Sequence, residues 1–468
     1  MSAAQMLVGG TWRSGSAELE VRDPYSGAVV GCAADGDPRD MVEAVQLAAA
    51  NRWTLRPHQR RAILEGAADG LLADSEGFAT SIRLESGMAH TAALREVDQA
   101  AALLRTTAAE MSGLRGGSMV TDVVPGAPPR HAMTLLEPVG VVLAVTPFNR
   151  PLNQVVVKLA PAIATNNSVV LKPSEKAPLT AIKFVELLLE VGLPAAMVSV
   201  VTGSPAPLVE AALGTGLVDM VTFTGSSAVG RSIAARAPMC RLAMELGDVG
   251  ALVVLEDADL PAAAAAAAKG SFDSAGQSCR GVKRILVARP VAAQFTELLV
   301  ERAGLIRVGD PADPATDMGT LISDAAARTV EDRVREAMDA GARLLLGGRR
   351  SGAQYWPTVL DRVPAESSLV AEETFGPVAP VLEVAGAEDA VAMVNAGPFG
   401  LQTGVFSRDH QTLMRMAEDL RVGTVVLNDG PQFSSPAIPF GGVKHSGLGR
   451  EGARWAMEAM CVTKTVVL

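Results

Sequence analysis

From residue 138 onward, short apolar runs alternate with stretches of helical periodicity. Runs such as 138–145, 168–171 and 251–255 are rich in Val, Leu and Ala and lack polar alternation, as expected for strands buried on both faces of a parallel sheet. Between them, apolar residues recur at intervals of three and four, the spacing of helices. This alternation predicts the α/β class, built from open, doubly wound parallel sheets.

The alternation occurs in two blocks, the second beginning near residue 251. With 468 residues and roughly 100–200 residues per domain, the chain is expected to form two α/β domains. Residues 116–135 are rich in Gly, Pro and polar side chains, and the tail 462–468 alternates. We therefore expect a small β-rich excursion from the main body, and a site in the cleft between the two domains.

Composition narrows the function classes. The balance of 41 Lys+Arg against 51 Asp+Glu gives a net charge of −10, which argues against a nucleic-acid partner. No apolar run reaches the roughly 18 residues of a membrane span, and the N-terminus does not resemble a signal peptide. The four cysteines are scattered and the five histidines lack ligand spacing, so we expect no disulfide framework, no metal site and a cytoplasmic location.

Three segments of the first block follow predicted strands directly. In Phe223–Gly230 (FTGSSAVG), glycines and a helix N-terminus suit a phosphate, although a serine-capped turn has the same pattern. In Lys172–Glu175 (KPSE), the carboxylate can bind both ribose hydroxyls and repel a 2′-phosphate, which favours NAD over NADP; a surface loop is the alternative. Asn149 offers an N–H donor to an oxyanion, although Asn here is often a turn former.

Two residues are candidates for the chemistry itself. Cys279 follows a Gly-Gln turn and precedes Arg280, and a cationic neighbour favours the thiolate, whose ordinary pKa is about 8.5. A lone cysteine is otherwise more often a small core residue. Glu245 lies among apolar residues at a strand end, where desolvation would raise its pKa toward that of a general base. A solvated turn carboxylate is the alternative.

In their order and spacing, these segments resemble the aldehyde dehydrogenase superfamily over essentially the whole chain. The matching segments are Asn149, Lys172–Glu175, Phe223–Ser226, Glu245–Asp248, Gly276–Cys279, Glu372–Pro377 and Pro439–Gly447. The resemblance implies two doubly wound parallel-sheet α/β domains: a Rossmann-like NAD-binding domain (1–115 and 136–246) and a catalytic domain (247–447). It also implies a small β oligomerisation segment (116–135 and 448–468) and a homodimer or homotetramer.

The resemblance also implies roles for single residues. Cys279 would attack the aldehyde as a thiolate, Asn149 would hold the oxyanion, and Glu245 would activate the water that hydrolyses the thioester. The implied cofactor contacts are Thr146, Pro147, Lys172, Ser174, Glu175, Gly203, Gly225, Ser226, Glu373 and Phe375. One departure stands out: Asp248 replaces the second glycine of the E-L-G-G pattern. We expect it to bring a side chain and a negative charge to the nicotinamide side.

The substrate prediction rests on arginines. Arg150 and Arg280 adjoin Asn149 and Cys279, and Arg95 lies on the predicted helix 91–104. Paired guanidinium groups suit a carboxylate, phosphonate or phosphate. Alternatively, these arginines pair with acidic residues across the cleft or close a subunit interface.

Several substrates fit this argument. The stretch 146–158 resembles the subgroup containing phosphonoacetaldehyde and lactaldehyde dehydrogenases, so we favour a small anionic aldehyde such as phosphonoacetaldehyde. A succinate-semialdehyde-type or lactaldehyde dehydrogenase is an alternative. Glu245 argues against a CoA-acylating enzyme, which needs no water-activating base. Retention of Cys279, Glu245 and Asn149 argues against a non-catalytic scaffold of the same fold.

Overall fold

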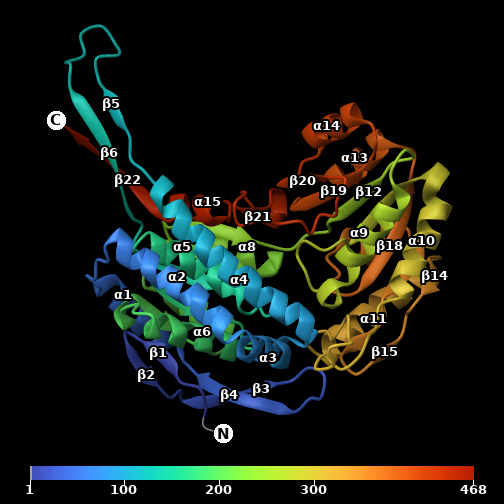
Figure 1. Ribbon diagram of the computed structural model, residues 1–468, viewed down its shortest axis with the longest axis horizontal. Helices are drawn as coiled ribbons and strands as arrows, with labels where there is room; N and C mark the ends of the chain where they lie inside the picture. Colours follow the sequence, from blue (N-terminus) through green and yellow to red (C-terminus); the bar gives the residue numbers. More distant parts are fainter. Residues whose placement is uncertain (1–2) are drawn as a thin grey trace.

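The computed structural model describes residues 3–468 and contains two large sheets. The eight-stranded first sheet has the order β2-β1-β9-β8-β7-β10-β11-β21, and the seven-stranded second sheet has the order β14-β17-β18-β13-β12-β19-β20. Each sheet lies with its helices in one half of the molecule (Figure 1). This arrangement confirms the predicted α/β class.

The first sheet is the central sheet of the N-terminal half. Its strands are β1 (Met6–Val8), β2 (Thr11–Arg13), β7 (Val141–Val145), β8 (Ser168–Lys172), β9 (Val198–Val200), β10 (Met220–Thr224), β11 (Arg241–Glu245) and β21 (Gly447–Leu448). Its helices are α1 (Pro38–Ala50), α2 (Pro57–Ala73), α3 (Ser75–Ser86), α4 (His90–Glu110), α5 (Asn153–Ala164), α6 (Leu179–Glu190), α7 (Pro205–Gly214), α8 (Ser227–Arg236) and α15 (Ala453–Ala459). A hairpin of β3 (Ala17–Arg22) and β4 (Val29–Asp35) accompanies it.

The second sheet follows directly after β11. Its strands are β12 (Ala251–Val254), β13 (Arg284–Ala288), β14 (Arg343–Leu346), β17 (Thr358–Asp361), β18 (Val378–Val384), β19 (Gln402–Phe406) and β20 (Thr424–Leu427). Its helices are α9 (Leu260–Phe272), α10 (Ala292–Gly304), α11 (Asp324–Asp339), α12 (Ser368–Ala371), α13 (Ala387–Ala396) and α14 (His410–Asp419), and a two-stranded ribbon joins β15 (Arg350–Ser351) to β16 (Gln354–Tyr355).

Five central strands of the first sheet, β9, β8, β7, β10 and β11, run parallel. All residues of β7, β8, β9 and β10 are buried, which explains their unbroken apolar runs. The chain proceeds from β7 outward to β9 and returns to β10 on the opposite side of β7. In open α/β sheets, such a reversal opens a crevice at the carboxyl ends of the strands.

Separate cores cover the faces of the sheets. On one face of the first sheet, Leu64, Val97 and Phe184 belong to one buried cluster, and Met41 and Leu208 belong to another on the opposite face. A third cluster contains the buried residues of the second sheet and its helices. Burial on both faces is what doubly wound sheets require. Within residues 3–468, none of the helices has the length and apolar character needed to cross a membrane.

The strand predicted over 138–145 is wrong at its start. Pro138 ends β6 (His131–Pro138), and β7 begins only at Val141. Between them, Gly140 adopts φ 127°, and a Cβ there would lie 2.1 Å from an Asp219 carboxylate oxygen. The chain turns here from one sheet into another. The single apolar run 138–145 therefore contains the end of β6 and the whole of β7.

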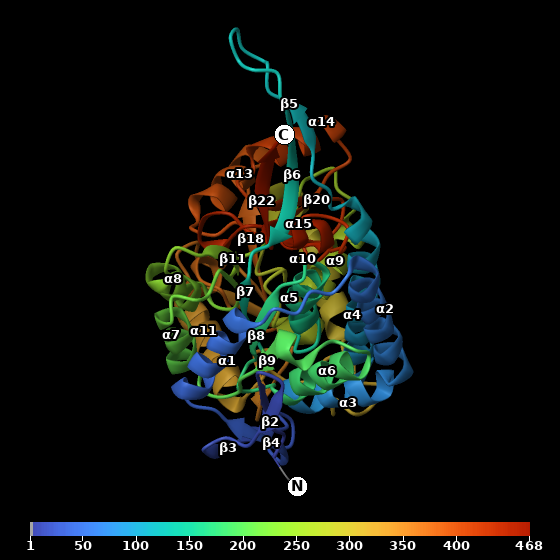
Figure 2. The ribbon, with the colours of Figure 1, turned by 90° about the vertical axis from the view of Figure 1, so that its left-hand side faces the viewer.

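Strands β5 (Ser118–Val120), β6 and β22 (Cys461–Val467) form an antiparallel three-stranded arm. The arm projects from the body in both views (Figures 1 and 2). The alternating tail pairs with β6 of its own chain, from Cys461 opposite Pro138 to Val467 opposite Ala132. The 116–135 excursion therefore contains β5 and the beginning of β6.

Asp248 ties the two sheets together instead of facing the cleft. Its carboxylate accepts hydrogen bonds from the backbone N–H groups of Leu401 (3.1 Å) and Gln402 (3.3 Å) and from the Ser446 hydroxyl (3.2 Å). Burial raises the pKa of Asp248 to about 6. The expectation that Asp248 brings its charge to the nicotinamide side is therefore wrong, because backbone donors at the start of β19 turn the carboxylate away.

We predict that Asp248→Ala destabilises the protein without changing its fold. Two buried N–H groups would lose their acceptor, at a cost of about 1–3 kcal/mol each. Thermal unfolding followed by circular dichroism measures the change as a lower midpoint. Asp69→Ala, which removes an exposed ion pair with Arg105, is the matched control and should leave the midpoint nearly unchanged. Equal midpoints for the two variants would contradict this role.

Candidate active site

The carboxyl edge of the first sheet presents predicted site residues from five neighbouring strands. Since these strands are parallel and adjacent, the residues that end them meet at one edge. They are Thr146 and Pro147 after β7, Lys172 at the end of β8, Gly203 after β9, Gly225 and Ser226 after β10, and Glu245 at the end of β11.

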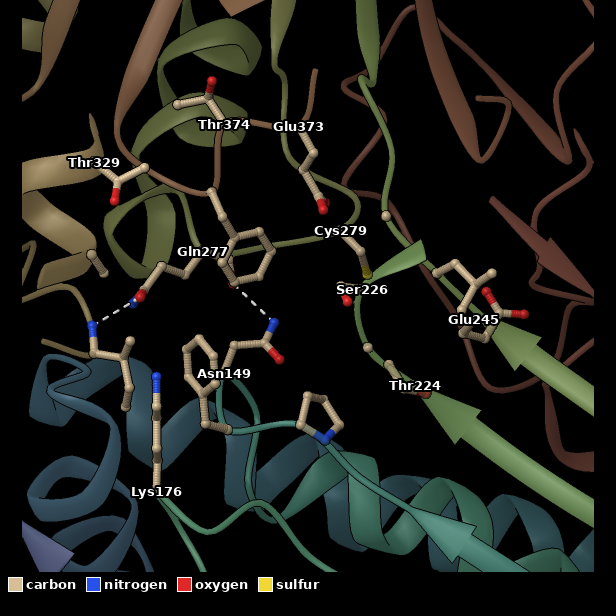
Figure 3. A pocket seen from close by; sticks show the side chains of 18 of the residues that line it. Asn149, Lys176, Thr224, Ser226, Glu245, Gln277, Cys279, Thr329, Glu373 and Thr374 are labelled. Carbon is tan, nitrogen blue, oxygen red and sulfur yellow. Dashed lines mark hydrogen bonds between the residues drawn. The ribbon is translucent and has the colours of Figure 1, made fainter. Parts of the chain in front are cut away.

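A cavity of about 390 Å³, here called the edge cavity, lies at this edge and is closed by the second sheet's segments. Figure 3 shows Asn149, Glu245 and Cys279 around it. Of the predicted residues, its lining contains Pro147, Asn149, Gly225, Ser226, Glu245, Cys279, Glu373 and Phe375. The other predicted cofactor residues lie farther along the sheet edge, near the ends of β7, β8 and β9: Thr146, Lys172, Ser174, Glu175 and Gly203.

The predicted cofactor residues that lie outside the edge cavity are closely packed. Lys172 is buried and pairs with Glu175 at 3.6 Å, and burial lowers the pKa of Lys172 to about 8. Gly203 has φ 134°, and a Cβ there would meet the Gly36 carbonyl oxygen at 2.8 Å. The half-exposed carboxylate of Glu175 is thus the acidic group available to a ligand here.

The turn just before Cys279 has unusual backbone geometry. Ser274, Ala275 and Gly276 are consecutive residues with positive φ, at 52°, 55° and 69°. Left-handed geometry costs a residue with a side chain about 1–3 kcal/mol, so contacts outside the turn must fix it. One of them is the close approach of Gly376, whose carbonyl oxygen would lie 2.1 Å from a Cβ on Gly276. This contact explains the glycine at 276, whereas a Cβ on Gly376 would lie 2.4 Å from a methyl group of Val330.

Gln277 fixes the turn on the side of the second sheet. Its side chain accepts a hydrogen bond from the Ile322 N–H (2.9 Å) and donates one to the Thr320 carbonyl (3.4 Å). Its backbone carbonyl accepts a hydrogen bond of 2.9 Å from the Asn149 amide. The Asn149 amide is therefore oriented by the nucleophile's own turn.

Lys283 also fixes this turn. Its buried ammonium donates to the Gly276 carbonyl and lies 5.3 Å from the centre of the Phe375 ring. Burial lowers the pKa of Lys283 to about 8, and the nearby Glu373 opposes this shift. Sequence reasoning missed Lys283, although a lysine four residues after the cysteine, beside a buried strand, is a signal that could have found it.

Burial dominates the electrostatics of Cys279. It raises the pKa of the thiol to about 11, while Arg280 lowers that pKa and Glu373 raises it further. The predicted influence of Arg280 is therefore present in the expected direction but is smaller than the cost of desolvating a thiolate. At neutral pH the free thiol keeps its proton.

Glu245 is desolvated, as the sequence predicts. It is 2% exposed, and within residues 3–468 neither carboxylate oxygen has a hydrogen-bond partner. Burial raises its pKa well above the ordinary value, and Glu451 raises it further while Lys158 opposes the shift. A Cβ on Gly441 would lie 2.7 Å from a Glu245 oxygen. The glycine at this position of the Pro439–Gly447 segment therefore leaves room for the Glu245 carboxyl group.

A buried ion pair beside Glu245 was not predicted. Lys158 is fully buried and donates to Glu451 at 2.9 Å and to the Thr222 hydroxyl at 3.3 Å. The signal was a lysine inside the apolar stretch of α5. No pattern pointed to its partner, which is 293 positions away.

A second cavity of about 180 Å³, here called the inner pocket, also reaches Cys279. It contains Asn149, Arg150, Cys279, Arg280 and Glu451 in its lining. Since Asn149 and Cys279 line both cavities, they stand between them. Cys279 thus lines two separate spaces.

The inner pocket continues into a polar pocket, here called the arginine pocket, with which it shares Arg150, Ser278 and Arg280. Arg95 lines the arginine pocket as well, so the structure brings the three predicted arginines together. Arg95 and Arg150 also make ion pairs with Asp273, at 3.6 and 3.8 Å. Both interpretations of these arginines, an anion pocket and pairing with an acid, thus have support.

Known proteins resemble this chain in sequence and in fold. Residues 12–466 match the model of the aldehyde dehydrogenase family. A 3-sulfolactaldehyde dehydrogenase of Priestia aryabhattai is 38% identical, over 99% of this chain and 97% of its own. The NADP-dependent glyceraldehyde-3-phosphate dehydrogenase of Bacillus halodurans, solved with NADP, has a TM-score of 0.97 at 32% identity, covering 100% and 99% of the two chains. An NAD-dependent aldehyde dehydrogenase of Sinorhizobium meliloti has a TM-score of 0.95 at 34% identity, covering 100% and 95%.

The raised pKa of Cys279 predicts how its reactivity depends on pH. Below the pKa, the thiolate fraction rises about tenfold per pH unit, so alkylation by iodoacetamide should accelerate steadily between about pH 7 and pH 9. Peptide mapping by mass spectrometry measures this rate at Cys279. Arg280→Gln should slow alkylation at every pH, because the pKa would rise further. A plateau near neutral pH would contradict the prediction.

Proposed function

Because the chain belongs to the aldehyde dehydrogenase family, we propose that its substrate is a small aldehyde that carries a negatively charged group. The chain is an oxidoreductase that acts on aldehydes, and its product would be the corresponding carboxylate. The observation that carries the proposal is the arginine pocket, where Arg95, Arg150 and Arg280 gather next to Cys279.

The nature of the anion follows from the chemistry of the arginines. Guanidinium groups bind oxyanions through charge-assisted, often bidentate hydrogen bonds. Phosphonates, sulfonates and phosphates share this recognition, and phosphonoacetaldehyde is the candidate that the sequence favours. The similar protein from Priestia is named for a sulfonated aldehyde, and the solved Bacillus enzyme is named for a phosphorylated one. Both names support an oxyanion-bearing aldehyde here.

The reaction would use Cys279 as nucleophile. Its proton leaves, the thiolate forms a bond to the carbonyl carbon, and the carbonyl oxygen becomes an oxyanion that the Asn149 amide and the Cys279 backbone N–H stabilise. Loss of hydride from that carbon leaves a thioester. Glu245 then takes a proton from water as it attacks, and the carboxylate leaves while the thiol is restored. The unpartnered, desolvated carboxyl group of Glu245 suits this role.

The edge cavity fits a nicotinamide dinucleotide, which would supply the hydride acceptor when bound. Thr224 lines this cavity, and its buried hydroxyl has no hydrogen-bond partner within the described residues. Ser226 is the N-cap of the ten-residue helix α8 there, and such an N-terminus suits a phosphate. Glu175 would bind a ribose and repel a 2′-phosphate, so we propose NAD.

The arm is proposed as an oligomerisation element of a homodimer or homotetramer in the cytoplasm. It exposes apolar side chains, with Val123 79% and Val124 61% exposed. Exposed apolar surface on a projecting β-ribbon favours contact with a second copy.

Charge removal tests the substrate proposal. For wild-type protein with NAD, kcat/KM should be larger for phosphonoacetaldehyde or 3-sulfolactaldehyde than for propanal, measured by absorbance of NADH. Arg150→Ala should lower kcat/KM for the anionic aldehyde about tenfold or more, because a charged hydrogen bond contributes about 1.5–3 kcal/mol. The value for propanal should change much less. Equal losses for both aldehydes would contradict an anion pocket.

Glu245→Gln tests the hydrolytic role. The variant should still release about one equivalent of NADH per site in a rapid burst, because the thiol adds to the aldehyde without Glu245. Steady turnover should fall about 100-fold or more, as expected when a general base is lost. Stopped-flow absorbance separates the two phases. Loss of the burst together with turnover would place Glu245 before the thioester instead.

A further inference from the structure

Asp273 stands among the arginines that are proposed to bind the substrate anion. One carboxylate oxygen lies 3.6 Å from an Arg95 nitrogen and the other lies 3.8 Å from an Arg150 nitrogen. All three residues line the arginine pocket together with Arg280. A carboxylate of the protein therefore lies where an anionic group of a substrate is expected.

The contacts of Asp273 are weak enough to be exchanged. Both distances exceed the length of a hydrogen bond, so charge alone holds the pairs. The Asp273 side chain is 36% exposed and that of Arg95 is 58% exposed, which allows water to screen this pair. The Arg150 side chain is 16% exposed, so its pair with Asp273 is screened less. An incoming oxyanion that reaches hydrogen-bond distance of both guanidinium groups would bind more strongly than Asp273 does.

Asp273 also adjoins the chemistry. It is the first residue of the strained turn 273–276 and lies six positions before Cys279 in the sequence. The ion pairs of Asp273 therefore connect α4, which carries Arg95, and the loop of Arg150 to the start of the nucleophile's turn. A role in specificity and a role in supporting the turn predict different kinetics.

We propose that Asp273 is a specificity-determining residue, a built-in competitor that the anionic group of the substrate displaces from Arg95 and Arg150. The inference rests on the proposed function. Asp273 neutralises part of the pocket's positive charge and so lowers the affinity of the pocket for every anion. Only an anion that engages both arginines still binds tightly. Weakly binding anions thus remain excluded while the correct substrate is accepted.

The test compares Asp273→Asn with wild type on an anionic aldehyde and on propanal. The isosteric amide removes the charge, so KM for phosphonoacetaldehyde or 3-sulfolactaldehyde should fall about fivefold, the size expected for an exposed ion pair. The kinetic constants for propanal should change much less than those for the anionic aldehyde. Inorganic sulfate, used as an inhibitor of propanal oxidation, should bind about fivefold more tightly to the variant.

Two further variants serve as controls. Asp69→Asn removes another carboxylate that pairs with an arginine of α4, Arg105, outside the arginine pocket, and should leave all constants unchanged. Asp273→Ser, which also removes the charge, should reproduce the effect of Asp273→Asn. Thermal midpoints measured in parallel show whether each variant is folded.

The outcomes are distinct. If KM and sulfate inhibition are unchanged in both Asp273 variants, the inference is overturned. An equal loss of kcat for both aldehydes would also overturn it, because this result would show that Asp273 only supports the turn. If wild type shows no preference for the anionic aldehyde and sulfate inhibits no variant, the proposed function fails as well.

Discussion

The turn of residues 274–276 cannot maintain its own geometry, and the site depends on the contacts that fix it. Two of its left-handed residues carry side chains, which is unfavourable for each of them. The supporting contacts come from Gly376, Lys283 and the amide of Ile322 in the C-terminal half. Asn149 contacts the turn from the N-terminal half. Cys279 therefore reaches its position only when both sheets have assembled.

The same close packing desolvates the titratable groups of the cleft. Burial raises the pKa of both Cys279 and Glu245 and lowers that of Lys283, so every shift favours the neutral form. A protonated thiol is a poor nucleophile and is slow to oxidise. The resting site thus stays unreactive, and Arg280 supplies the positive charge that partly offsets the cost of forming the thiolate.

Local patterns predicted what depends on local physics. Apolar runs marked the buried strands, and strand ends located Asn149 and Glu245 at one sheet edge. Where the prediction failed, a distant contact was responsible. The carboxylate of Asp248 turns toward the amides of residues 401 and 402, and Lys158 pairs with Glu451 across 293 positions. No periodicity encodes such partners, because each contact joins segments that are far apart in the sequence.

Cys279 lies between two spaces whose linings differ. Arg95, Arg150 and Asp273 line the arginine pocket but not the edge cavity. Their replacement would alter which group is recognised while leaving the wall formed by Ser226 and Glu373 unchanged. Asp273 is the exception to full separation, because it begins the turn 273–276 that leads to Cys279. A change of specificity at this residue would therefore have to preserve the backbone that positions Cys279, whereas a change at Arg95, on helix α4, would carry no such constraint.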